Sequence, residues 1–169
     1  TDAHVERLMT EGARVTGVAA TVDGAPQEFL AREVIVCAGA LQSPEMLLRA
    51  GIGPAAQLRA LDMKVTADRV GVGANLQNHA VVYLVAQLRR DAAQPAAMKS
   101  HSTATERFSS GVAGCGPLDM SMSISSKIGG HALGRRIGAL VPTLLKPASH
   151  GDVTLFRDGA GISRRIEFN

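Results

Sequence analysis

The feature that most constrains the fold is a continuous apolar run at residues 33–40 (EVIVCAGA), followed directly by a segment that suits a helix. The run is β-branched at its start and has no polar face, which is typical of a strand covered on both sides. Ser43 can then cap a helix, and Gly51 can end it in the left-handed conformation. The sequence therefore predicts an interior strand over 34–38, a turn at Gly39 and a helix that starts at Ser43.

Two further residues fit this helix start. Pro44 needs no N–H at the first helical position, and Glu45 would lie near the positive end of the helix dipole. A strand, a small-residue turn and a helix in this order favour a ligand site at the carboxyl end of the strand, where Gly39 would let a ligand approach the backbone. An equally good interpretation is that Gly39 only turns the chain, because such junctions are common in α/β folds.

The first half of the chain otherwise predicts a β-meander and a short helix. Glu11-Gly12 and Asp23-Gly24 interrupt short runs of Val, Leu and Thr, and each glycine can take the positive φ that a tight hairpin needs. A helix is expected where Leu58 and Leu61 share one face. The expected strands are 3–10, 14–22 and 27–30, and the expected helix is 54–61.

The second half predicts an antiparallel sheet. Residues 91–116 are dense in Ala, Ser, Thr and Gly and have no clean period, so they are expected to form a long connection. The segments with strand-like composition are 80–88, 137–145, 152–157 and 165–168.

Composition excludes several classes of function. The formal net charge is +3, and the basic residues come as separated pairs rather than as one stripe, so no nucleic-acid partner is expected. No apolar run approaches the roughly 18 residues of a membrane helix, so no transmembrane segment is expected, and no targeting peptide is visible. Cys37 and Cys115 lie outside any CxxC pattern, which favours a reduced, cytoplasmic protein without a zinc or redox pair.

No complete nucleotide-binding or metal-binding motif is present. The cluster at 71–73 (GVG) does not complete GxGxxG, so other residues would have to complete any dinucleotide pocket. The five histidines show no ligand-like spacing, and no metal site is expected. Ser43 lies in QSP and not in GxSxG, so helix capping explains it better than a nucleophilic role.

Three segments, taken together, resemble one enzyme family. Residues 39–54 (GALQSPEMLLRAGIGP) are similar to the second signature of glucose-methanol-choline oxidoreductases, GA-x-x-SP-x-x-L-x-x-SGIGP, with Ala50 in place of Ser. Residues 71–79 (GVGANLQNH) resemble the family's GVG-x-NLQDH, with Asn78 in place of Asp. Residues 146–155 (KPASHGDVTL) resemble its PxSRGxVxL segment, with His150 in place of Arg. The chain is identified as an internal, choline dehydrogenase-like fragment of this family.

The resemblance implies a mixed fold, α/β to α+β. Residues 1–79 would be part of an FAD-binding, doubly wound domain, and residues 80–169 part of a substrate-binding domain with an antiparallel sheet. FAD would be the cofactor. By position, the backbone of Val5 would meet the adenine, and Ala38 and Gly39 would line the FAD cleft.

The resemblance also implies hydride transfer from an alcohol CH–OH group to flavin while a histidine removes the hydroxyl proton. That histidine would lie beyond Asn169 and the GxGxxG segment before Thr1, so the chain is expected to hold no catalytic residue, to be inactive alone and to need the missing parts of its own enzyme. His79 would only organise the junction between domains.

The expected substrate is a small-molecule primary alcohol. Choline is disfavoured, because Ala80 follows the motif histidine where choline-oxidising relatives carry an acidic residue. Two alternatives stay open, a catalytically silent binding module that reuses the fold and an unrelated small α/β domain.

Overall fold

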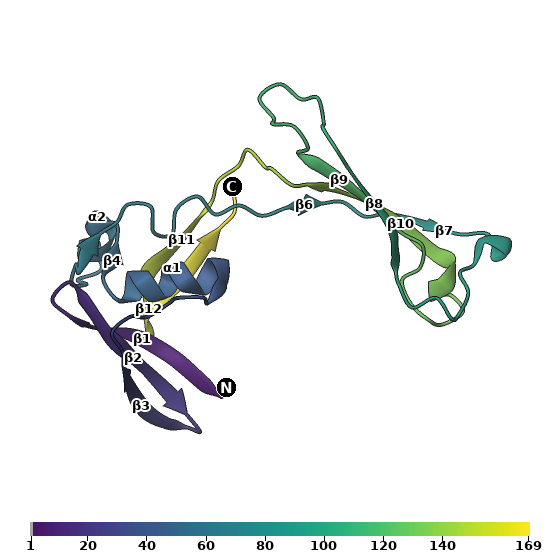
Figure 1. Ribbon diagram of the computed structural model, residues 1–169. Helices are drawn as coiled ribbons and strands as arrows, with labels where there is room; N and C mark the ends of the chain where they lie inside the picture. The colour runs from purple at the N-terminus through teal and green to yellow at the C-terminus, as the bar shows by residue number, and fades with distance from the viewer. Residues whose placement is uncertain (1) are drawn as a thin grey trace. The chain divides into compact units, whose positions relative to one another are not determined.

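The computed structural model describes residues 2–169, which form two compact units (Figure 1). Unit 1 combines the chain up to Leu76 with His150–Asn169, and unit 2 is Gln77–Ser149. The first boundary lies close to the predicted one after residue 79. The predicted 80–169 domain differs at its end, because residues 150–169 return to unit 1, where they pack against a helix of that unit.

Unit 1 begins with the predicted meander, which is confirmed. Its strands are β1 (Ala3–Glu11), β2 (Arg14–Val22) and β3 (Ala25–Leu30), antiparallel in the order β1-β2-β3. Gly12 and Gly24 turn the chain with φ of +60° and +78°. A register shift between Val5 and Arg7 leaves a bulge at Glu6 near the start of β1.

Two helices and a short parallel pair follow the meander. They are α1 (Gly39–Arg49), β4 (Ile52–Gly53), α2 (Ala55–Ala60) and β5 (Ala67–Asp68). The predicted second helix is confirmed, and so is the left-handed end of the first, where Gly51 has φ of +77° and its N–H donates to the Leu48 carbonyl at 2.9 Å. Leu48 and Leu58 are fully buried and form the core with Leu155.

The predicted interior strand over 34–38 is wrong for this structure. The segment has no strand partner among residues 2–169, and the Ile35 side chain is 79% exposed. A parallel strand is buried only where neighbours cover it on both sides, and the described part of the chain supplies none here.

The C-terminal hairpin completes unit 1. Its strands are β11 (Asp152–Asp158) and β12 (Gly161–Glu167), which pair antiparallel and pack against α1. Leu76 and Gly151 exchange two backbone hydrogen bonds of 2.8 Å at the base of the hairpin. The predicted strands at 152–157 and 165–168 are thereby confirmed, the second with an earlier start.

Unit 2 is an antiparallel sheet, as predicted. Its elements are β6 (Ala80–Val81), β7 (Leu84–Gln87), η1 (Arg90–Ala92), β8 (Ser102–Phe108), β9 (Met120–Ser125), η2 (Gly134–Arg136) and β10 (Ile137–Leu144). The hydrogen-bonded order is β6-β10-β9-β8, and β7 also pairs with β10. The predicted connection over 91–116 is wrong, because it contains the end of a 3₁₀ turn and all of β8.

The predicted mixed class, α/β to α+β, is confirmed, because strands dominate both units and the α-helices lie in unit 1. No helix among residues 2–169 is long and apolar enough to cross a lipid bilayer.

Candidate functional site

A cavity of about 690 Å³ lies in unit 1 between β1, the segment 34–38 and α1. We call it the unit 1 cavity. Strand β1 contributes His4, Val5 and Glu6, and α1 contributes four side chains from Gln42 to Arg49. Strand β1 and the continuous stretch 34–49, which are far apart in sequence, thus enclose one space large enough for part of a cofactor.

Two of the three predicted cofactor-binding residues meet at this cavity. Val5 and Ala38 both line it, although 33 positions separate them in the sequence. Gly39 follows Ala38 with φ of +85°, and a Cβ placed on Gly39 would meet nothing within 4 Å. The backbone turn therefore requires glycine at this position, and the space that a Cβ would occupy is empty.

Helix α1 begins at Gly39, so the predicted start at Ser43 is wrong. The Ser43 hydroxyl accepts a hydrogen bond from the Ala38 N–H at 3.0 Å, which satisfies a backbone donor just before the helix. Pro44 lies in the helix interior, where it can donate no hydrogen bond to the carbonyl of Ala40. The Ser43 hydroxyl still supports the start of the helix, from inside its first turns and not from the capping position.

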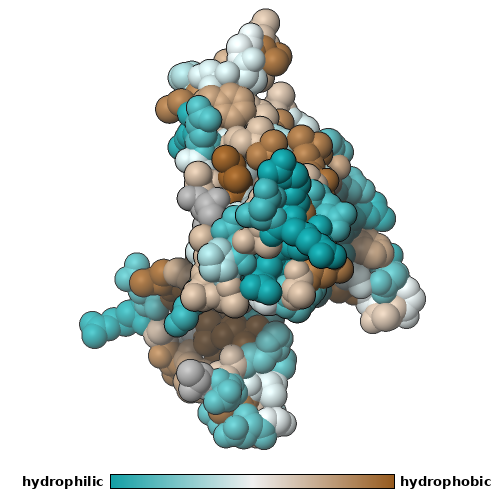
Figure 2. All heavy atoms as spheres, turned by 90° about the vertical axis from the view of Figure 1, so that its right-hand side faces the viewer, coloured by the Kyte–Doolittle hydropathy of each residue, from teal (hydrophilic) through white to brown (hydrophobic). Residues whose placement is uncertain are grey.

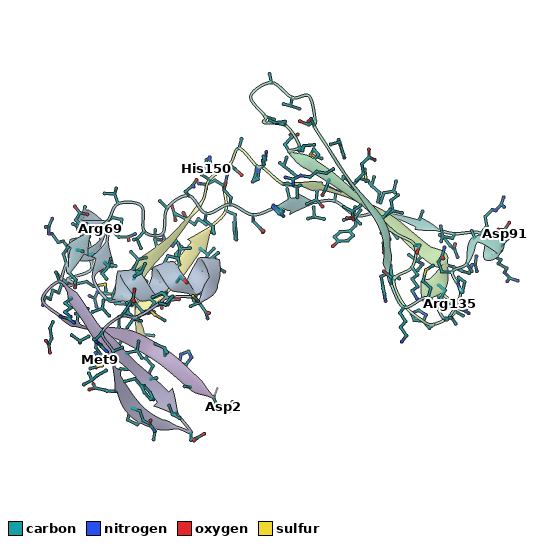
Figure 3. All side chains as sticks on the ribbon, in the orientation of Figure 1. Asp2, Met9, Arg69, Asp91, Arg135 and His150 are labelled. Atoms are coloured by element: carbon teal, nitrogen blue, oxygen red, sulfur yellow. The ribbon has the colours of Figure 1, made fainter. Side chains whose placement is uncertain are left out.

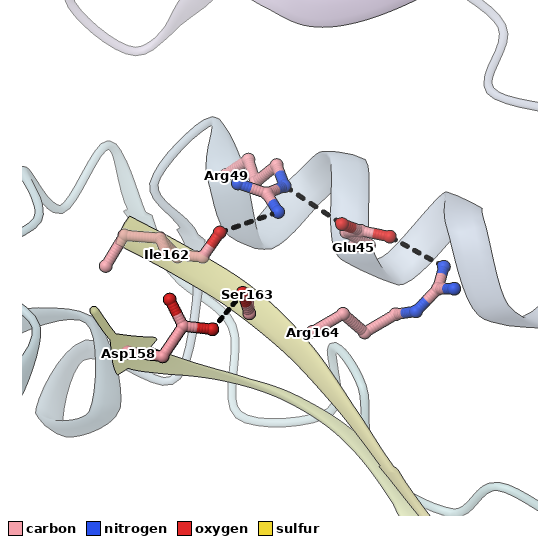
Figure 4. Close-up of polar contacts among 6 residues, drawn as sticks. All are labelled: Glu45, Arg49, Asp158, Ile162, Ser163 and Arg164. Atoms are coloured by element: carbon pink, nitrogen blue, oxygen red, sulfur yellow. Dashed lines mark hydrogen bonds and ion pairs between the residues drawn. The ribbon is translucent and has the colours of Figure 1, made fainter. Parts of the chain in front are cut away.

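Glu45 organises the polar wall of the unit 1 cavity (Figure 4). Its carboxylate accepts from Arg164 Nη1 at 2.7 Å and from Arg49 Nε at 3.0 Å, and Arg49 also donates to the carbonyl of Ile162 at 3.0 Å. These bonds fasten β12 to α1. Glu45 therefore acts as an anchor between elements and not at the helix N-terminus, where the sequence predicted it.

Sequence reasoning missed both arginines at this cavity. The four-residue spacing from Glu45 to Arg49 was a usable signal, because residues at i and i+4 are neighbours on a helix. Arg164 lies 119 positions from Glu45 and carried no local signal.

The glycines of the second and third motifs make close backbone contacts. A Cβ on Gly73 would lie 2.1 Å from the Val153 carbonyl oxygen, and one on Gly151 would lie 1.9 Å from that of Glu167. The Val153 N–H donates to the Gly73 carbonyl at 2.7 Å. Residues of both motifs thus meet in unit 1, where only glycine leaves room for the neighbouring backbone.

The histidines form no shared centre. His4 lines the unit 1 cavity, whereas His79 and His150 are exposed. Among residues 2–169, no group of three or more His, Cys, Asp or Glu side chains is placed to hold a metal ion. Cys37 and Cys115 are free and exposed, and Cys37 lines the unit 1 cavity.

A second, apolar cavity of about 690 Å³ lies in unit 2. Its walls come from β7, β9 and β10, and Tyr83, Leu84 and Val85 contribute large exposed side chains. Sequence reasoning did not predict this cavity, because its lining depends on how three separate strands pair.

The sequence profile of the family described as GMC oxidoreductase matches residues 1–81. A 5-(hydroxymethyl)furfural oxidase from Methylovorus sp. (strain MP688) is 45% identical over 130 residues, which are 75% of this chain and 24% of that protein. An oxygen-dependent choline dehydrogenase from Pseudomonas aeruginosa (strain LESB58) is 47% identical over 87 residues, 50% of this chain and 16% of that protein.

Solved structures show the same fold. The pyridoxine 4-oxidase of Mesorbium loti superposes with a TM-score of 0.77 at 25% identity, over 98% of this chain and 33% of that chain. A formate oxidase of Aspergillus oryzae RIB40 superposes with a TM-score of 0.75 at 20% identity, over 90% of this chain and 36% of that chain. The chain therefore spans about a third of these structures and a quarter or less of the curated relatives.

Proposed function

We propose that this chain is part of an FAD-dependent oxidoreductase acting on an alcohol. The premise is that the chain belongs, over residues 1–81, to the family of GMC oxidoreductases. The observation that carries this proposal is the unit 1 cavity, where Val5 and Ala38 meet beside the turn at Gly39. FAD, when bound, accepts a hydride from the alcohol carbon.

The residues of the unit 1 cavity fit part of a dinucleotide. The backbone of residues 34–37 has no strand partner within residues 2–169, so its N–H and C=O groups can meet a polar ligand, whereas the Ala38 N–H already donates to Ser43. Val5, Val34 and Ala38 offer apolar surface to a planar ring, and Gly39, directly after Ala38, adds no side chain to the turn. These residues would bind and orient the cofactor, and none of them would transfer a proton.

We assign the two units different roles within this proposal. Unit 1 would be part of the flavin-binding domain, and unit 2, with its antiparallel sheet and apolar cavity, part of the substrate-binding domain. The substrate would be a primary alcohol, the group that 5-(hydroxymethyl)furfural and choline share. Ala80 keeps choline itself the less favoured of the two.

The amount of exposed surface supports a role within a larger protein. The chain exposes 11044 Å², whereas two equal compact bodies of the same total mass, 17.6 kDa, would expose about 9500 Å². Part of the excess is apolar, including Ile35 and the run from Val81 to Val85. Further polypeptide that covers these side chains would bury them as a protein core does.

A chimera tests the proposed function. The segment of the Methylovorus 5-(hydroxymethyl)furfural oxidase that matches this chain over 130 residues would be replaced by the matching part of this chain, and flavin absorbance per polypeptide and alcohol oxidation would be measured. We expect the chimera to retain flavin. In the chimera, Gly39→Val should reduce the affinity for FAD by roughly tenfold or more, because its methyl groups would occupy space beside the adenine-side residues.

Gly12→Val is the matched control. Gly12 also has a positive φ, and a Cβ placed on it would meet nothing within 4 Å, but it lies in the β1–β2 turn away from the cavity lining. Both substitutions strain the backbone by on the order of 1–3 kcal/mol. Equal flavin content in the two variants, or a folded chimera that binds no flavin, would contradict the proposal.

A further inference from the structure

The positive charge of the chain is concentrated in unit 2. Residues 77–149 contain eight Lys and Arg against three Asp and Glu, although the whole chain has a formal net charge of only +3. Six of the eight lie in the segments 88–101 and 126–136, which we call the basic end. They are Arg89, Arg90, Lys99, Lys127, Arg135 and Arg136.

Backbone hydrogen bonds hold the segments of the basic end together. Asp91 and Arg135 mark this end in Figure 3, and Figure 2 views the molecule from that side and shows strongly hydrophilic side chains gathered there. Two bonds join segment 88–101 to the arginines: the Leu88 N–H donates to the Arg136 carbonyl (2.6 Å) and the Gln94 N–H to the Arg135 carbonyl (3.0 Å). In two further bonds, the Ser126 N–H donates to the His101 carbonyl (3.1 Å) and the Ile128 N–H to the Gly134 carbonyl (3.0 Å).

Lys127 is buried at the basic end without a counter-charge. The residue is 3% exposed, and its ammonium has no hydrogen bond or ion pair within residues 2–169. Nearby, the Nε atom of Arg135 is buried and has no acceptor within the same residues. The Ile128–Gly134 hydrogen bond makes Lys127 and Arg135 neighbours on adjacent stretches of backbone. Burial of a cation is costly unless an anion or hydrogen-bond acceptors compensate for the lost water.

The basic end contains little negative charge that could balance its cations. Asp91 is the one carboxylate in segments 88–101 and 126–136, and Arg89 already binds both of its oxygens, at 3.1 and 2.5 Å. The Arg136 guanidinium donates to the carbonyl of Leu88 at 3.3 Å. Arg90, Lys99, Lys127 and Arg135 are thus left without a carboxylate partner in the described part of the chain.

We propose that the basic end is a binding site for a phosphate group, with Lys127 and Arg135 as its main ligands. A tetrahedral dianion can accept from the planar guanidinium fork and from the point charge of an ammonium at once. A phosphate there would give the buried Arg135 Nε the acceptor that it lacks and would place a negative charge beside Lys127, which has no ion pair within residues 2–169. The site lies wholly in unit 2 and is independent of the unit 1 cavity and of flavin.

Titration of the 169-residue chain with inorganic phosphate tests this site. Calorimetric titrations and thermal melts would compare phosphate with acetate and chloride at equal ionic strength, without flavin. We expect phosphate, and not acetate or chloride, to bind and to raise the melting temperature. Equal effects of the three anions would indicate screening alone and overturn the proposal, as would the absence of phosphate binding.

The variant Lys127→Met tests whether Lys127 binds phosphate or only contributes to the fold. The variant should melt at a higher temperature than the parent chain without phosphate, because an unpaired buried charge is gone, and should bind phosphate roughly tenfold or more weakly. Lys64→Met, an exposed lysine of unit 1, should change neither property. Arg135→Gln gives an independent variant with the same expected loss of affinity. Unchanged phosphate affinity in both Lys127→Met and Arg135→Gln would refute the assignment.

Discussion

Asp119 is a fully buried carboxylate that holds the loop between β8 and β9. Its Oδ2 accepts from the Ser110 hydroxyl at 2.6 Å and its Oδ1 from the Ser110 N–H at 2.8 Å. These bonds, the hydroxyl first, lower the pKa of Asp119 below its ordinary value of 3.8, while burial acts in the opposite direction. The ionised form is therefore the one that the folded loop prefers.

The depressed pKa of Asp119 predicts how the stability of unit 2 depends on pH. A carboxyl whose folded pKa lies below its unfolded value contributes stability above the unfolded pKa and loses it as pH falls through the folded one. We expect Asp119→Asn to lower the urea midpoint at pH 7, and the difference from the parent chain to shrink below about pH 4. Glu106→Gln, an exposed carboxylate of β8, is the control. A pH-independent difference would contradict this prediction.

At the residue scale, the sequence predicted part of the candidate site. Val5 and Ala38 could be proposed from motif positions, and the structure places them at one cavity. Gly39 could be recognised as a turn from its place after an apolar run. Arg164 and the buried Lys127 could not be predicted, because their surroundings depend on contacts between segments distant in sequence and on how a loop closes after β9.

Gly73 connects the loop after β5 to the hairpin strand β11. Its φ is +84°, and a Cβ would collide with the Val153 carbonyl at 2.1 Å. We expect Gly73→Ala to break the 2.7 Å bond from the Val153 N–H and to lower the free energy of unfolding by roughly 1–3 kcal/mol. Urea denaturation followed by circular dichroism measures the change. Gly71→Ala, where a Cβ meets nothing within 4 Å, should cost less than half as much, and equal losses would argue against the contact.

At the element scale, local signals predicted the elements that local interactions determine. Strands β1 to β3 and helix α2 follow from turn glycines and short-range patterns, and all four are present. The segment 34–38 was mispredicted because its burial depends on neighbours on both sides. Strand β9 (MSMSIS) and strand β8 (STATERF) were not predicted, because Ser, Met, Ala and Glu give weak strand signals until a partner strand is known.

The chain leaves unit 1 for unit 2 and returns to unit 1 at one point, the Leu76–Gly151 pair. The two backbone hydrogen bonds of 2.8 Å between these residues have the geometry that closes a two-residue hairpin. Replacing residues 77–150 by an Asn-Gly turn should therefore leave the backbone conformation of unit 1 unchanged. We expect the shortened chain to retain a cooperative thermal transition followed by circular dichroism.

The core of unit 1 provides the control for this deletion. Leu48, Leu58 and Leu155 come from both sides of the deleted segment, so they can pack only if the hairpin returns to α1. Leu155→Ala in the shortened chain should lower the free energy of unfolding by about 2–5 kcal/mol. If the shortened chain is unfolded before that substitution is made, the two units depend on each other for stability.

The single attachment point has an evolutionary consequence. A segment joined to its host through one pair of adjacent residues can be lengthened, shortened or exchanged by recombination while the host's hydrogen-bond register is kept. We expect natural variants of this chain to differ in length and composition mainly between Leu76 and Gly151, so that unit 2 can diverge in lineages that inherit the same unit 1.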